Sequence, residues 1–441
     1  MRRKARPGGG RQVEVTIEGL GSRGDGYTEL EGRLLFVALT LPGDRARVKI
    51  SGEQAGASRG ELLELIEAGP GRCEAPCPHF GSCGGCGLQH LEDRAYAAWK
   101  RGQVLQALAR RGLAAAVVGE MVRIPPGTRR RAVLSARQGS KSPQGSTSSE
   151  GRGLRLGFYG RDSHRVEDLQ SCLILTPGLL ALIPPLRAAL APLVGADERW
   201  GLVVSETETG IDLCLQARRA PELRDREALA ALAGASDLAR VSWQERDSQP
   251  EPIVVRRAPV VTFGEVAVTP PPGGFLQPSR AGEQALSDLV LSHLPGDASR
   301  VADLYSGCGT FTFRLSAQAG VSAAEGDGLA LAALQAAARQ AGLANRVSAE
   351  QRDLARRPLT ADELRPFDCV VFDPPRAGAG AQAEELAQSR VPRVIAASCN
   401  PATFARDARI LVDGGYRLTS LVPVDQFPWT EHVELVACLE R

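Results

Sequence analysis

The sequence has no long uninterrupted apolar run and almost no net charge. Its most apolar stretch, residues 172–194, is broken by prolines and an arginine, which argues against a membrane-spanning helix. The net charge is +2, so any affinity for nucleic acid must come from local basic patches. The chain starts Met1-Arg2-Arg3-Lys4, with no apolar leader. We therefore expect a cytoplasmic protein that is not attached to a membrane.

Cysteine is better represented, with ten residues, and in a reducing compartment this indicates metal binding or catalysis before disulfides. Three of them stand in Cys77-Pro-His-Phe-Gly-Ser-Cys83-Gly-Gly-Cys86, and Cys172 lies far downstream. Thiolates at short spacings joined by a distant fourth are typical of iron–sulfur ligation. Four cysteines can also hold zinc, which is the competing metal. Cys73 is an additional thiol, either a bystander or a competitor for the metal.

Composition and periodicity divide the chain into three expected domains. Residues 1–70 begin with a basic tail and continue with short alternating strands punctuated by glycine, the pattern of a small β-barrel. Residues 71–265 hold the clustered cysteines, and a Gly/Ser-rich stretch at 139–153 predicts a flexible insertion. Residues 266–441 form the third domain, in which strands alternate with helices from about residue 298, and this predicts a parallel sheet. Because each domain should bury its own core, we expect a monomer.

A glycine-containing turn in the third part predicts a nucleotide-like ligand. The strand over residues 301–305 ends at Tyr305 and leads into Ser-Gly-Cys-Gly-Thr, where backbone can approach a ligand closely. The next strand ends in Glu325, and an acid there can bind both ribose hydroxyls of an adenosine. The turn lacks the third glycine of the dinucleotide fingerprint, so S-adenosylmethionine is favoured over NAD. The structural alternative is a tight turn with an exposed acid.

Three further reactive groups follow or flank strands near the C-terminus. Residues 367–372 form an apolar strand that ends in Asp373-Pro-Pro, a stiff loop at the ligand-binding edge of such sheets. Another strand leads into Cys399-Asn-Pro, a polar turn in which a cysteine is well placed as a nucleophile. The segment Phe-Pro-Trp-Thr-Glu-His-Val-Glu ends at Glu434. Taken singly, a cysteine most often packs in a core and a glutamate is usually exposed to solvent.

Methylation of uracil at carbon 5 requires this combination of groups. Carbon 5 is too weak a nucleophile to attack a sulfonium methyl group unaided. A thiolate that adds to carbon 6 activates carbon 5, and a base must then remove the carbon 5 proton so that the thiol can leave. Cys399 and Glu434 supply these two groups. Methylation of an amine or a hydroxyl needs no such cysteine.

The chain resembles the uracil-C5 RNA methyltransferase family, specifically its iron–sulfur branch that modifies 23S ribosomal RNA. The resemblance covers essentially the whole chain. It implies an α/β protein with a C-terminal Rossmann-like class I methyltransferase domain, an N-terminal oligonucleotide-binding (OB-type) β-barrel called a TRAM domain, and a central α+β iron–sulfur domain. It rests on five motifs in this order: Cys77–Cys86 with Gln89-His90, Asp303–Thr312, Asp373–Gly378, Ser398–Pro401 and Phe427–Glu434.

The resemblance also implies roles for individual residues. Cys399 is expected to be the nucleophile and Glu434 the base. The expected ligands of a four-iron four-sulfur cluster are Cys77, Cys83, Cys86 and Cys172, and the expected contacts of S-adenosylmethionine are Gln277, Tyr305, Glu325 and Asp373. The sequence departs from the usual family pattern at Pro278-Ser279, Thr310 and Glu431.

RNA is the expected partner. Phe158 and Tyr159 lie among arginines that could bind phosphates while the rings stack on splayed bases, and the alternative is a solvated charged face. The target base must leave its stack to reach Cys399. Two other functions stay open: a transfer-RNA uracil-5 methyltransferase, whose branch generally lacks the cluster cysteines, and a catalytically inactive iron–sulfur RNA-binding protein. The arginines are Arg123, Arg129, Arg130, Arg131, Arg137, Arg152, Arg155, Arg161 and Arg165.

Overall fold

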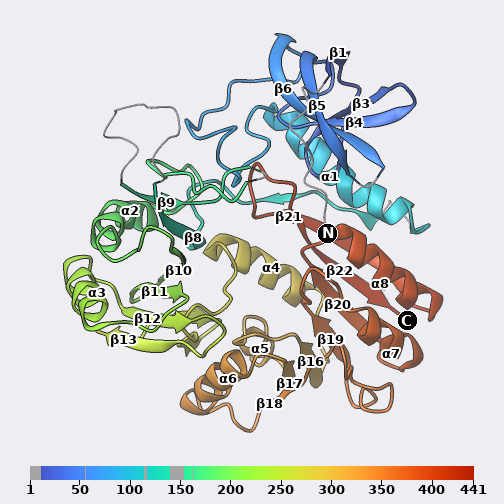
Figure 1. Ribbon diagram of the computed structural model, residues 1–441. Helices are drawn as coiled ribbons and strands as arrows, with labels where there is room; N and C mark the ends of the chain where they lie inside the picture. The colour runs from blue at the N-terminus through green and yellow to red at the C-terminus, as the bar shows by residue number, and fades with distance from the viewer. Residues whose placement is uncertain (1–10, 55, 114–116, 140–152, 162) are drawn as a thin grey trace, which may run out of the picture. The chain divides into compact units, whose positions relative to one another are not determined.

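The computed structural model describes residues 11–54, 56–113, 117–139, 153–161 and 163–441 (Figure 1). Residues 140–152 of the expected insertion and the basic tail at 1–10 lie outside the described residues. The chain divides into two compact units. The first comprises residues 1–103 and 429–431, and the second comprises residues 104–428 and 432–441. Within the described ranges, no helix is long and apolar enough to cross a membrane.

A six-stranded sheet dominates the first unit. Its strand order is β1-β5-β6-β4-β3-β2, and all its neighbours are antiparallel except β4 and β6. Alternate residues such as Ile17, Leu35 and Val48 point into one small core, as the alternating pattern predicts. A Cβ atom at Gly60 would lie 2.3 Å from a Val48 methyl group, so β6 requires glycine where it packs on β5. The strands are β1 (Gln12–Thr16), β2 (Gly19–Leu20), β3 (Gly26–Leu30), β4 (Arg33–Val37), β5 (Arg45–Gln54) and β6 (Ala57–Glu67).

The cysteine segment in the first unit is irregular and is followed by α1 (Asp93–Ala109), most of which belongs to the same unit. Directly after the third cysteine, the N–H groups of Gly87 and Leu88 donate to the Trp429 carbonyl at 2.8 and 3.0 Å. The Trp429 N–H donates to the Tyr96 hydroxyl on α1 at 2.9 Å. Trp429 has a φ of +60°, a left-handed conformation that these contacts help to hold.

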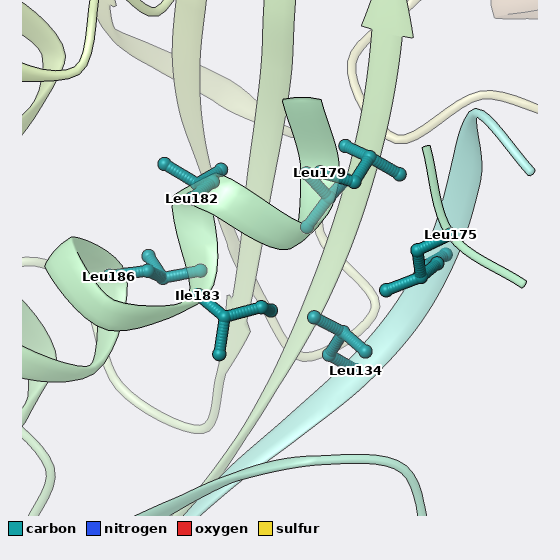
Figure 2. Close-up of a pocket in the computed structure, with 8 residues that line it drawn as sticks. Leu134, Leu175, Leu179, Leu182, Ile183 and Leu186 are labelled. Carbon is teal, nitrogen blue, oxygen red and sulfur yellow. The ribbon is translucent and has the colours of Figure 1, made fainter. Parts of the chain in front are cut away.

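The second unit contains a mixed sheet with the order β13-β12-β11-β10-β8-β9. Helices α2 (Pro177–Leu190) and α3 (Leu223–Ala235) cover one face of this sheet, and their leucines pack against alternate strand residues such as Leu134 and Leu202. Figure 2 shows the space between α2 and β8, which is lined by aliphatic side chains and belongs to the core. The strands are β8 (Arg131–Gln138), β9 (Leu154–Gly157), β10 (Arg199–Thr207), β11 (Gly210–Ala217), β12 (Arg240–Glu245) and β13 (Glu251–Val255).

An eight-stranded sheet forms the rest of the second unit, together with the hairpin β14 (Val261–Phe263) and β15 (Val266–Val268). The order is β18-β17-β16-β19-β20-β22-β21-β7, and the five strands from β18 to β20 are parallel, as the sequence predicts. The strands are β7 (Val122–Arg123), β16 (Arg300–Leu304), β17 (Gly320–Glu325), β18 (Val347–Gln351), β19 (Cys369–Phe372), β20 (Arg393–Ser398), β21 (Arg417–Asp425) and β22 (Glu434–Glu440).

Helices cover both faces of the eight-stranded sheet (Figure 1). Leu386 and Phe404 of α7 and α8 pack into one core, while Leu286 of α4 packs into another with strand residues of the opposite parity. Parallel strands buried on both faces leave their C-terminal edge as the natural ligand site. The helices are α4 (Arg280–Ser292), α5 (Thr312–Leu315), α6 (Gly328–Gln340), α7 (Gly380–Gln388) and α8 (Pro401–Asp413).

Candidate active site

The C-terminal edge of the parallel strands brings four of the predicted site residues to one side of the sheet. Tyr305 follows β16, Glu325 ends β17, Asp373 follows β19 and Cys399 follows β20. Because these strands run parallel and in register, their last residues meet at this edge. The sequence could predict this gathering because each residue stands at the end of an apolar strand.

The turn after β16 has an unusual backbone. Tyr305 has a φ of +60°, although it is not glycine, and Gly307 and Gly309 have φ values of +56° and +103°. The N–H of Tyr305 donates to the Ala324 carbonyl at 2.9 Å, which anchors the turn to β17. A left-handed tyrosine costs on the order of 1–3 kcal/mol, and such strain is concentrated at functional sites. The Gly309 backbone also packs too closely on Phe313 to admit a Cβ atom.

Three acids surround this turn. The two carboxylate oxygens of Glu325 accept hydrogen bonds from the N–H groups of Gly307 and Asp327, at 2.8 and 2.7 Å. Burial raises the pKa of Asp303 to about 7, with further increases from the charges of Asp373 and Glu325 and opposition from the Thr312 hydroxyl. Burial also raises the pKa of Asp373 to about 6. Such a site favours a cationic ligand because a positive charge would offset the clustered carboxylates.

Gln277 lies beside Asp373. Its Nε2 donates to Asp373 Oδ2 at 3.3 Å, and its Oε1 accepts from Gln426 Nε2 at 2.9 Å. Gln277 and Gln426 are both buried. Sequence reasoning missed Gln426, because nothing in its local pattern separates it from an ordinary residue at the end of β21. It also gave no separate role to Asp303, whose Oδ1 has no hydrogen-bond partner among the described residues.

Cys399 and Glu434 adjoin the last residue pair of two neighbouring strands, and the negative charge of Glu434 raises the pKa of the Cys399 thiol. β20 and β22 are antiparallel, and their ladder ends at the Ser398–Leu435 pair; Cys399 follows Ser398 and Glu434 precedes Leu435, so both lie at the same end of the ladder. Residues directly opposite in such a ladder have Cβ atoms about 4.5–5.5 Å apart. Glu434 is 6% exposed and Cys399 is half-buried. A thiol and a carboxylate are therefore close enough to serve one substrate atom and its neighbour.

The groups around Cys399 shift the pKa of its thiol in opposite directions. Burial raises the pKa of the Cys399 thiol to about 11, and the negative charges of Glu434 and Asp373 raise it further, while Arg376 opposes them. The backbone carbonyl of Arg376 accepts hydrogen bonds from Asn400 Nδ2 at 3.1 Å and from the Thr403 hydroxyl at 3.3 Å. The first turn of α8 thus holds the loop that carries this arginine against the cysteine turn.

Arg130, one of the predicted RNA-binding residues, does not lie on the surface. Arg130 is buried, and its guanidinium lies 2.5 Å from Glu283 and 3.3 Å from the Gln277 carbonyl oxygen. Arg314 donates to the other Glu283 oxygen at 3.0 Å. The prediction that Arg130 contributes to a surface patch is therefore wrong, because the charge neutralises a buried carboxylate. Arg131 donates to the Gly274 carbonyl at 3.1 Å.

The cluster cysteines are divided between the two units. Cys77, Cys83 and Cys86 belong to the first unit and Cys172 to the second. Among the described residues, no three or more His, Cys, Asp or Glu side chains form a group that could hold a metal ion. The Gly85 N–H donates to Cys83 Sγ at 3.4 Å, a contact of the kind that tunes iron–sulfur ligands. Cys73 instead donates to the Gln89 carbonyl at 3.6 Å. The donor chemistry of the segment fits a thiolate-bound metal.

The parallel sheet, the glycine turn after β16 and the acid that ends β17 define a class I methyltransferase. Residues 265–441 match the family model described as tRNA (Uracil-5-)-methyltransferase, and residues 9–63 match the TRAM domain. The chain belongs to this family of RNA (uracil-5-)-methyltransferases. It is 42% identical over 433 residues to an uncharacterized RNA methyltransferase of Rhizobium meliloti, covering 97% of this chain and 99% of the relative.

Two further relatives extend the comparison. The chain is 34% identical over 454 residues to 23S rRNA (uracil(1939)-C(5))-methyltransferase RlmD of Halomonas elongata, covering 97% of this chain and 89% of the relative. The crystal structure of Pyrococcus abyssi tRNA (uracil-54, C5)-methyltransferase in complex with S-adenosyl-L-homocysteine superimposes with a TM-score of 0.73. That match covers 97% of this chain and 100% of the other at 21% identity, so it shows a shared fold. The predicted methyltransferase and TRAM folds are confirmed.

Proposed function

We propose that this enzyme transfers a methyl group from S-adenosylmethionine to carbon 5 of a uridine in 23S ribosomal RNA. The observation that carries the proposal is that Cys399 and Glu434 adjoin the Ser398–Leu435 pair, at the edge that holds the acidic turn, and that the charge of Glu434 raises the pKa of the Cys399 thiol. The relative from Halomonas elongata, which is named for this reaction, supports the choice of ribosomal RNA. Cytoplasmic location is part of the same proposal, since the substrate would be met there.

The donor occupies the acidic turn in this proposal. Glu325 binds the ribose hydroxyls through a carboxylate that the Gly307 N–H already orients. Asp303 and Asp373 offset the positive charge of the sulfonium, and Gln277 and Tyr305 line the same site. The complex of the Pyrococcus abyssi relative with S-adenosyl-L-homocysteine supports this donor. NAD has no comparable support, because the turn lacks the third glycine of its fingerprint.

The reaction proceeds through a covalent adduct. The Cys399 thiol loses its proton, and the thiolate forms a bond to carbon 6 while the electron pair of the 5,6 double bond moves toward the carbonyl at carbon 4. Carbon 5 then attacks the methyl group, and S-adenosylhomocysteine leaves with the sulfonium electron pair. Glu434 removes the carbon 5 proton, the double bond re-forms and the carbon–sulfur bond breaks. Arg376 favours the thiolate because its charge opposes the effect of the two acids.

We further propose that a four-iron four-sulfur cluster binds to Cys77, Cys83, Cys86 and Cys172. The all-thiolate donor set and the N–H contact to Cys83 support it, and zinc is the competing metal. Bound to four cysteines, the cluster would link two distant segments of the chain, and methyl transfer itself needs no electron from it. The domain boundaries at residues 70 and 265, the central iron–sulfur domain and a monomeric state belong to the same proposal.

A transfer-RNA substrate is the second candidate. The matching family model and the solved relative from Pyrococcus abyssi both carry transfer RNA in their names. The inactive RNA-binding alternative is disfavoured because Cys399 and Glu434 are both present and adjoin the same residue pair of the sheet.

The deciding experiment offers labelled S-adenosylmethionine with unmodified 23S ribosomal RNA or with unmodified transfer RNA, and identifies the product nucleosides. 5-Methyluridine in ribosomal RNA alone supports the proposal. Label in transfer RNA alone would identify transfer RNA as the substrate in place of ribosomal RNA. Label in neither RNA, from protein that carries its metal, would favour the catalytically inactive RNA-binding alternative.

A further inference from the structure

Three arginines line up across neighbouring strands of the mixed sheet in the second unit. Arg137 on β8 pairs with Arg155 on β9 and with Arg199 on β10. Side chains directly opposite in an antiparallel sheet lie on the same face, so the three cations form one row. The arginine row, Arg155-Arg137-Arg199, spans about 10 Å because adjacent strands are about 4.8 Å apart.

The row carries an uncompensated positive charge. None of its three members makes an ion pair with any residue that the structure describes. Like charges directly opposite each other destabilise a sheet, so packing gives no reason for their alignment. Neighbouring arginines are neutralised: Arg240 on β12 by Asp212, and Arg219, in the loop after β11, by Asp225. A free row of cations among paired ones suits a polyanionic partner.

An aromatic side chain adjoins the row. The Arg199 guanidinium lies 5.6 Å from the centre of the Tyr159 ring, and His164 meets the same ring edge-on at 6.2 Å. Tyr159 is 39% exposed. Arginines beside an exposed ring are the combination that holds a single-stranded nucleic acid, since phosphates take the charges and a base stacks on the ring.

Strand β8 connects the row to the methyl-transfer site. Arg131, Val133 and Arg137 share the face of β8 that is turned away from the leucine core, and Val133 is 52% exposed. Arg131, at the start of the strand, donates to the Gly274 carbonyl, three residues before Gln277. Six residues of extended strand place the row about 20 Å from this point. Strand β8 thus runs from the segment that carries Gln277 to the row, with a buried residue, Ser135, on the same face between Val133 and Arg137.

We propose that the arginine row binds the sugar–phosphate backbone of the substrate RNA on one flank of the target uridine, with Tyr159 stacking on an unpaired base. This rests on the proposed function. RNA is favoured over an acidic protein because the row combines cations with an exposed ring and shares β8 with the reaction site.

The test compares two triple variants that remove the same charge. Arg137→Gln/Arg155→Gln/Arg199→Gln removes the row, and the control Arg339→Gln/Arg356→Gln/Arg365→Gln removes three exposed arginines elsewhere in the same unit. Affinity for an oligouridylate of about 20 nucleotides is measured at several salt concentrations. Three lost phosphate contacts should raise Kd at least tenfold and reduce the slope of log Kd against log salt by about 2, whereas the control should change neither. Tyr159→Leu should weaken binding several-fold without changing the slope.

The outcomes separate this proposal from the proposed function. With ribosomal RNA, the row variant should show a raised KM and an unchanged kcat, because none of its residues touches the reacting atoms. An unchanged Kd and salt slope in the row variant, or an equal loss of affinity in both triple variants, would overturn the proposal that the arginine row binds RNA. A different outcome is a wild-type protein that transfers no methyl group to ribosomal or transfer RNA while the row variant still shows a reduced slope of log Kd against log salt. That result would overturn the proposed function but support RNA binding by the row. Matching thermal melts of both variants show that each is folded.

Discussion

The Arg130 guanidinium contacts the carboxylate of Glu283, 153 residues further along the chain. The same side chain reaches the Gln277 carbonyl, and the Arg130 N–H donates to the carbonyl of Pro278 at 2.8 Å. The start of β8 is therefore fastened to the segment that carries Gln277. Arg130 belongs to a run of three arginines in the sequence, but in the structure it helps to position Gln277 beside Asp373.

Replacing Arg130 by Met should lower the free energy of unfolding by about 3 kcal/mol. The substitution leaves the buried Glu283 carboxylate with Arg314 as its remaining cation, and breaking a buried ion pair costs about 3–5 kcal/mol. The exposed Arg137→Met change serves as the control and should stay within about 0.5 kcal/mol. Urea unfolding of both variants measures the difference. Equal stability of the two would show that the pair contributes nothing.

The two proposed reacting groups should fail in different ways. Cys399→Ala cannot add to carbon 6, so methyl transfer should fall below detection. Glu434→Gln can still form the adduct and transfer the methyl group, but it cannot remove the carbon 5 proton, so a covalent protein–RNA complex should accumulate. A denaturing gel with labelled RNA detects that complex. The control Cys73→Ala should keep full activity, and an active Cys399→Ala enzyme would rule out the mechanism.

The reactivity of Cys399 should follow the charges around it. Its pKa is raised to about 11, so below that value the thiolate fraction and the alkylation rate should rise about tenfold per pH unit. Glu434→Gln removes a negative charge that raises the pKa and should speed alkylation at pH 8. Arg376→Gln removes the opposing positive charge and should slow it. Mass spectrometry of the Cys399 peptide measures all three rates, and identical rates would show that these charges do not reach the thiol.

The parallel strands and the edge of the site could be predicted from the sequence because both follow from local patterns. Apolar runs at residues 301–305 and 393–398 mark strands, and a polar residue at each strand end marks the ligand edge. Glycines in the turn after Tyr305 also carry a local signal. Each of these inferences uses only neighbours in the sequence.

Pairings between distant residues could not be predicted in the same way. Arg130 stands next to two other arginines, and only the tertiary fold brings Glu283 to it. The alignment of Arg155 with Arg137 and Arg199 likewise depends on strand register, which the sequence leaves open over the stretch at 139–153. Trp429 gave no sign that its carbonyl accepts from Gly87, because that contact joins segments more than 300 residues apart in the sequence.

Asp303→Asn should change the pH dependence of stability. The pKa of Asp303 is raised from 3.8 to about 7, so between these values the folded state binds a proton that the unfolded state has lost. Its contribution to stability is full below pH 3.8 and is lost as the pH rises through 7. Relative to Asp303→Asn, the wild type should therefore lose about 2.5 kcal/mol of unfolding free energy between pH 5 and pH 8.

Asp368 provides the matched control for that measurement. Hydrogen bonds from the backbone N–H groups of Arg300 and Ser299 lower the pKa of Asp368, so both its folded and unfolded pKa values lie below pH 5. The difference between wild type and Asp368→Asn should therefore be constant from pH 5 to pH 8. A constant difference for Asp303→Asn as well would mean that the Asp303 carboxyl is ionised in the folded protein throughout this range.

Metal analysis should distinguish Cys172 from Cys73. If the proposed cluster uses Cys77, Cys83, Cys86 and Cys172, protein purified without oxygen should contain about four iron atoms and four sulfides per chain. Cys172→Ser removes one ligand and should lose most of the iron and the visible absorbance. Cys73→Ser should keep both, because the Cys73 thiol donates to the Gln89 carbonyl. About one zinc atom per chain and no sulfide would indicate a zinc site and not an iron–sulfur cluster. Loss of iron in Cys73→Ser but not in Cys172→Ser would indicate that Cys73, and not Cys172, is the fourth ligand.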